Sequence, residues 1–83
     1  MKDSTFFNNY LKAIEAWAGF EIHFLEDFED ICTCDVDYIE LLLMGEHKFS
    51  LNLLDTENTL QDFKTVRDFI NWAGENSILQ AAS

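Results

Sequence analysis

The apolar residues of this chain recur at spacings of three and four, and they nowhere alternate with polar residues over a useful length. The first such run follows Ser4, a residue type that caps helix N-termini well, and stops before Gly19. Its members are Phe6, Phe7, Tyr10, Leu11, Ile14 and Trp17. Side chains at this spacing share one face of an α-helix, whereas a half-buried strand requires a period of two. The pattern therefore predicts an all-α fold.

The middle of the chain predicts a connector, a second helix and a short third element. The connector, residues 21–35, is acidic and carries the apolar anchors Ile22, Phe24, Leu25, Phe28 and Ile31. The second helix is expected from about residue 36 to residue 49, with Asp35 as its N-cap. The third element is expected after Asp55, as a turn through residues 56–58.

The last helix has the clearest signals. Thr65, followed three residues later by Asp68, approximates a capping box. Its apolar face is expected to consist of Val66, Phe69, Ile70 and Ala73. Gly74 is expected to end the helix, which leaves residues 75–83 as a frayed tail. The sequence thus predicts one domain over residues 1–83, a small bundle of three main helices plus one short helix.

Charge excludes several classes of partner. The 83 residues include 16 Asp and Glu against 5 Lys and Arg, a formal net charge of −11. Such a field repels nucleic acids and anionic membrane surfaces, because binding phosphate requires clustered cations. It favours a protein partner with a basic surface and speeds the encounter with it. With 48% hydrophobic and 14% aromatic residues, the chain is too apolar to be a disordered tail.

Nothing in the sequence predicts a signal peptide or a membrane span. The first residues contain one cation and no long apolar run. The longest apolar run, residues 39–44, is interrupted by Glu40 and is far shorter than the roughly 20 residues of a membrane span. Cys32 and Cys34 are separated by one residue, and a bridge between them would be strained. We therefore expect reduced thiols in a cytoplasmic protein. The chain is also expected to be a monomer.

Two segments resemble the acyl carrier proteins. Residues 29–41 read EDICTCDVDYIEL, and the family signature reads E-D-L-G-x-D-S-L-D-x-V-E-L. Residues 65–70 read TVRDFI, similar to T-V-x-D-x-I on the last helix of the family. The two matches are collinear and cover about the C-terminal two-thirds of the chain. The resemblance implies a carrier-like bundle associated with fatty acid, polyketide or secretion-related pathways.

The chain departs from that family at its attachment site. The family's serine in D-S-L holds a phosphopantetheine arm through its hydroxyl; here Asp35 stands at that position and Cys34 precedes it. A carboxylate cannot form that phosphodiester, and neither Thr33 nor Ser50 lies where the arm would be attached. Aspartate caps a helix about as well as serine does, a contribution of about 0.5–2 kcal/mol relative to alanine. We therefore expect the structural role to be kept and no phosphopantetheine cofactor to be carried.

A helical wheel divides the second helix into two apolar faces. The face assigned to the core consists of Tyr38, Leu42, Gly45 and Phe49. The neighbouring stripe, with its acidic border, consists of Val36, Ile39 and Leu43 with Asp37, Glu40 and Glu46. The resemblance implies that this helix docks to partner enzymes, so these six residues form the expected docking site. The alternative is that the helix is buried on both sides.

No enzyme or metal site is expected. One conceivable zinc set, Cys32, Cys34, His23 and His47, lacks the usual ligand spacing. One conceivable calcium set, Asp35, Asp37 and Glu40, lacks the glycine and spacing of a calcium loop. Two alternatives to a docking domain remain open. One is a carrier that uses another attachment or binds an apolar ligand inside the bundle; the other is an acidic inhibitor or chaperone-like module.

Overall fold

The computed structural model describes the backbone of residues 4–49, 51, 53 and 57–82, and the side chains of residues 5–49, 51, 53 and 57–75. Within these ranges the chain is helical and contains no strand, which confirms the predicted all-α class. The elements are α1 (Ser4–Ala18), α2 (Phe28–Ile31), α3 (Asp35–Phe49), the 3₁₀ turn η1 (Leu60–Asp62) and α4 (Val66–Ala82).

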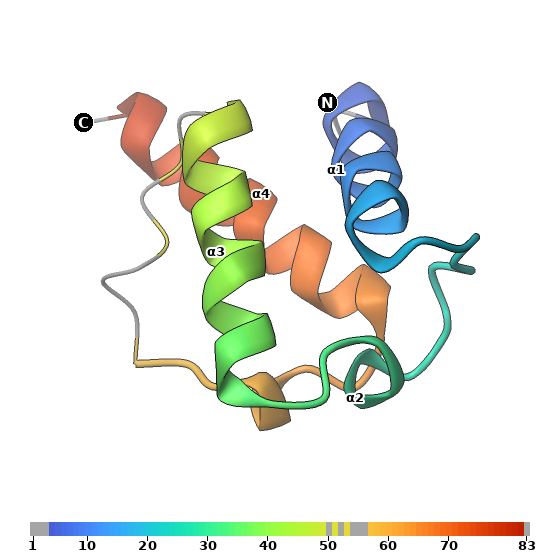
Figure 1. Cartoon of the computed structure of the whole chain (residues 1–83). Coiled ribbons are helices and arrows are strands. Elements are labelled where there is room, and N and C mark those ends of the chain that lie inside the picture. Colours follow the sequence, from blue (N-terminus) through green and yellow to red (C-terminus); the bar gives the residue numbers. More distant parts are fainter. Residues whose placement is uncertain (1–3, 50, 52, 54–56, 83) are drawn as a thin grey trace.

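The three long helices form the bundle, and the two short elements close one end of it. α1 packs against both α3 and α4. Figure 1 shows α4 beginning below the end of α1 and crossing behind α3, with α2 and η1 at the end of the bundle where α3 begins. α1 ends as predicted, because Gly19 follows it with a φ of 90°.

The core is built around one phenylalanine of α4. Phe69 is fully buried, and its ring lies 4.8–6.2 Å, centroid to centroid, from five other aromatic rings. These rings come from every part of the fold: Tyr10, Phe28, Tyr38, Phe63 and Trp72. The predicted apolar face of α4 is confirmed, since Val66, Phe69, Ile70 and Ala73 are all 0% exposed.

α4 begins as predicted but ends later. The capping box is confirmed: the Thr65 amide donates to Asp68 Oδ2 at 3.2 Å, and the Asp68 amide donates to Thr65 Oγ1 at 3.2 Å. The helix then runs through Ala82, so the prediction that Gly74 ends it is wrong. Gly74 instead lies where α4 meets α1, and a Cβ there would stand 3.1 Å from Phe6 Cε2. Residues 75–82 are therefore helical rather than a frayed tail, and residue 83 lies outside the described residues.

The short third element differs from its prediction. Asp55 and residue 56 lie outside the described residues, and residues 57 and 58 are not helical. The helical turn η1 starts at Leu60 and follows Thr59, whose amide donates to Asp62 Oδ2 at 2.8 Å. Thr59 followed three residues later by an acid is a weaker version of the signal that marks α4.

The acidic connector is fixed to the start of α4 by its backbone. The amides of Val66 and Arg67 donate to the carbonyls of Glu26 and Phe24 at 3.0 and 2.8 Å. Two of the amide groups that a helix leaves unpaired at its N-terminus are thereby satisfied by the connector. A bridge between Asp27 and Thr65 continues this pairing. The connector, which includes α2, is therefore held against the bundle by hydrogen bonds as well as by the buried anchors Ile22, Phe28 and Ile31. The prediction that Leu25 is an anchor is wrong, because this side chain is 48% exposed.

Candidate docking surface

α3 leaves one apolar face in solvent. Its buried face contains Tyr38, Leu42 and Gly45, with Phe49 half-buried against the core, as predicted. On the neighbouring face, Val36 is 63% exposed, Ile39 47% and Leu43 38%. We call these three residues the α3 stripe. The helix is therefore not buried on both sides, and the residues that the wheel assigned to each face lie on that face. The wheel left out Leu41, which is 0% exposed and belongs to the buried face.

The start of α3 uses a different aspartate from the one predicted. Asp35 is the first residue of the helix, is exposed, and accepts no hydrogen bond among the described residues. Asp37 Oδ2 instead accepts from the Thr33 amide at 3.3 Å and from the Thr33 hydroxyl at 3.0 Å. The assignment of Asp35 as the N-cap is therefore wrong. The sequence has an acid at both position 35 and position 37. Only the path of the chain before the helix decides which of the two carboxylates accepts hydrogen bonds from Thr33.

The other two acids of the border are also held by hydrogen bonds. Glu46 Oε2 accepts from the Leu53 amide at 2.9 Å, which ties the segment after α3 back to the helix. Glu40 Oε1 accepts from Trp17 Nε1 at 2.9 Å, which links α3 to the end of α1. Asp37, Glu40 and Glu46 are thus positioned acids and not a loose acidic rim. Periodicity places Trp17 on the core side of α1, so sequence reasoning missed its polar contact.

The two cysteines are free, as predicted, and differ in exposure. Cys32 is buried and Cys34 is exposed. Burial, with smaller effects from the charges of Asp37, Cys34 and Asp35, raises the pKa of Cys32 to about 12. At neutral pH Cys32 is therefore a protonated thiol in the core and not a nucleophile.

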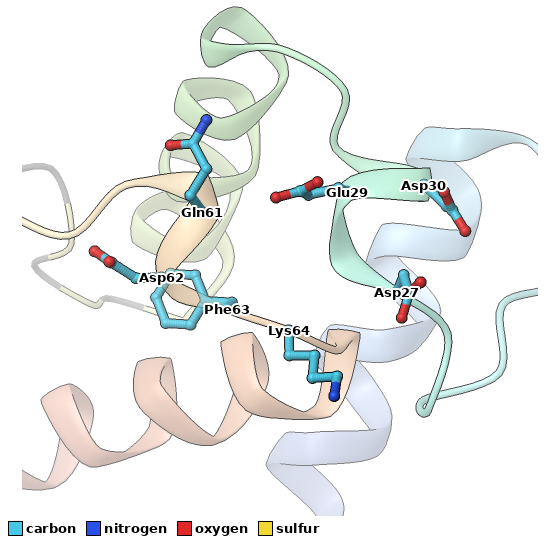
Figure 2. Close-up of a pocket in the computed structure, with 7 residues that line it drawn as sticks. All are labelled: Asp27, Glu29, Asp30, Gln61, Asp62, Phe63 and Lys64. Atoms are coloured by element: carbon cyan, nitrogen blue, oxygen red, sulfur yellow. The ribbon is translucent and has the colours of Figure 1, made fainter.

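A polar cleft of about 390 Å³ lies between α2 and η1. It is lined by Asp27, Glu29, Asp30, Gln61, Asp62, Phe63 and Lys64. In Figure 2, Glu29 points across the cleft towards η1, while Asp27 and Asp30 point away from it. Asp62 is already engaged by the Thr59 amide. Among the described residues, no three His, Cys, Asp or Glu side chains form a group that could hold a metal ion.

None of the helices in the described part of the chain has both the length and the apolar character that crossing a membrane demands. No family model, no curated protein and no solved structure gives a significant match to this chain.

Proposed function

We propose that this chain is an acyl-carrier-like domain that carries no phosphopantetheine arm and acts by docking to a protein partner through the α3 stripe. The observation that carries the proposal is the exposure of Val36, Ile39 and Leu43 on one side of α3. Single exposed apolar residues are normal on a protein surface, but several aligned on one face mark an interaction site. In this proposal the chain is a non-enzymatic, cytoplasmic monomer.

The charge around the stripe defines the partner. Asp35, Asp37, Glu40 and Glu46 all lie on α3, in a chain whose net charge is −11. An apolar contact surrounded by charge is the usual arrangement of a protein interface, with the apolar part at the centre. The expected partner therefore has an apolar groove bordered by basic residues, and electrostatic attraction would raise its association rate.

The neighbouring leucines of α3 provide the test. The probe is a 15-residue amphipathic peptide with leucines on one face and arginines on the other. Leu43→Ala should weaken its binding roughly fivefold, because about 1 kcal/mol of binding free energy from apolar burial is lost. The loss should appear mainly as faster dissociation in surface plasmon resonance.

Leu42→Ala is the matched control for stability. Leu42 is 3% exposed, so its replacement should cost about 2–5 kcal/mol of unfolding free energy, the range for a buried leucine. Leu43→Ala should cost less than about 2 kcal/mol, because Leu43 is already 38% exposed. Equal losses in urea denaturation would mean that Leu43 is a core residue, and the docking proposal would fail.

The chain should also resist attachment of a phosphopantetheine arm. Asp35 offers no hydroxyl nucleophile, so intact-mass measurement after treatment with coenzyme A and a broad-specificity transferase should show no added mass. A serine-bearing carrier protein is the positive control for the transferase, and Asp35→Ser tests whether the surrounding residues are still recognised. A gain of roughly 340 Da by the unaltered chain would contradict the proposal that it carries no arm.

A further inference from the structure

We infer that the docking surface continues from α3 onto α1, where Trp17 holds the Glu40 carboxylate in position for an arginine of the partner. This inference rests on the proposed docking function and names the chemistry that the partner brings to one edge of the α3 stripe.

The contact between Trp17 and Glu40 is a surface contact between two helices. The two residues are 23 positions apart, and Trp17 Nε1 donates to Glu40 Oε1 at 2.9 Å. Glu40 is exposed, whereas Trp17 is half-buried and packs against the core. The core therefore fixes the indole ring, and its N–H group fixes a carboxylate that lies in solvent. An exposed glutamate without such a partner would sample many rotamers.

The Glu40 carboxylate, held by Trp17, can accept a second hydrogen bond from a donor of the partner. Only Oε1 of Glu40 takes part in the hydrogen bonds found among the described residues, which leaves Oε2 to accept from a ligand. Ordering a side chain before binding lowers the entropy cost of association. Glu40 also follows Val36 by one helical turn, so an arginine that reaches it would approach beside the stripe.

Arginine fits this position better than lysine does. A planar guanidinium can donate to Glu40 Oε2 and also lie against the Trp17 indole, combining a charged hydrogen bond with a cation–π contact. A lysine ammonium is a point charge and gains less from a fixed carboxylate. The surrounding field favours any cation, since residues 26–40 include seven acids and no basic residue. A preference of the protein for arginine over lysine would therefore reflect the Trp17–Glu40 pair and not the overall negative charge.

The experiment compares two 15-residue amphipathic peptides that share a leucine face and carry either arginines or lysines on the other face. The unaltered protein should bind the arginine peptide roughly tenfold more tightly. Trp17→Phe keeps a ring in the core but removes the N–H donor, so this ratio should fall below about threefold while the unfolding midpoint changes little. Glu40→Gln should reduce the ratio in the same way.

Two controls separate this inference from general effects. Glu21→Gln removes the same charge from an exposed position outside the surface, so the ratio should not change. Leu43→Ala should weaken both peptides equally and also leave the ratio unchanged. If the unaltered protein binds both peptides equally, or if the ratio survives Trp17→Phe, the inference is overturned while the docking function stands. If neither peptide binds, or if Leu43→Ala has no effect on either, the docking function is overturned as well.

Discussion

Phe69→Ala is expected to lower the free energy of unfolding by about 3–5 kcal/mol, the range for emptying a buried aromatic site. The ring is fully buried and is stacked 4.8 Å from Phe28, with four further rings around it. Rings contributed by α1, α2 and α3 converge on this site, so local relaxation cannot fill the cavity without moving several elements. The loss should be measured by urea denaturation followed by circular dichroism.

The expected loss is large relative to the stability of so small a domain. Folded proteins are stable by roughly 0.05–0.15 kcal/mol per residue, which gives about 4–12 kcal/mol for a chain of this length. At the lower end of that range, Phe69→Ala would leave much of the population unfolded. Phe20→Ala is the matched control, because Phe20 is 53% exposed and its replacement should cost less than about 1 kcal/mol. A similarly small loss at Phe69 would show that the aromatic core is not centred on α4.

Gly45→Ala is expected to destabilise the protein by about 1–3 kcal/mol, the usual cost of overpacking a core. A Cβ at this position would stand 2.5 Å from the Tyr10 hydroxyl oxygen and 2.9 Å from Leu53 Cδ1. The Tyr10 hydroxyl cannot move without weakening its buried hydrogen bond to the Leu41 carbonyl, in which it donates at 2.8 Å. Alanine normally stabilises a helix interior by about 1 kcal/mol relative to glycine. A loss of stability in Gly45→Ala would therefore indicate that the new methyl group meets Tyr10 and Leu53.

A double-mutant cycle with Tyr10→Phe tests the cause. The phenylalanine variant removes the oxygen that meets the new methyl group, so Gly45→Ala should cost less in that background than in the unaltered protein. Stability measured for the four proteins gives the coupling energy. If Gly45→Ala proves stabilising, or if the two changes are simply additive, α1 and α3 do not approach as closely as the structure shows.

Local periodicity predicted the three long helices, and capping chemistry predicted the start of α4 and the end of α1. Side chains three and four residues apart share a helix face, so the sequence alone separated the buried Leu42 from the exposed Leu43. The capping box of α4 involves only Thr65 and Asp68, and it was predictable because both partners lie within one helical turn. The end of α1 at Gly19 is equally local, because it depends on the backbone of one residue.

Contacts between distant segments decided the features that the sequence did not reveal. α4 continues past Gly74, where close approach of Phe6 gives the glycine a packing role in place of a terminating one. The connector caps α4 with backbone carbonyls, and carbonyls are present at every residue and leave no sequence signal. The contact between Trp17 and Glu40 could not be predicted from the sequence either, because neither residue has a local sequence signal that indicates it. Their hydrogen bond exists only because the packing of α1 against α3 brings together two side chains 23 residues apart.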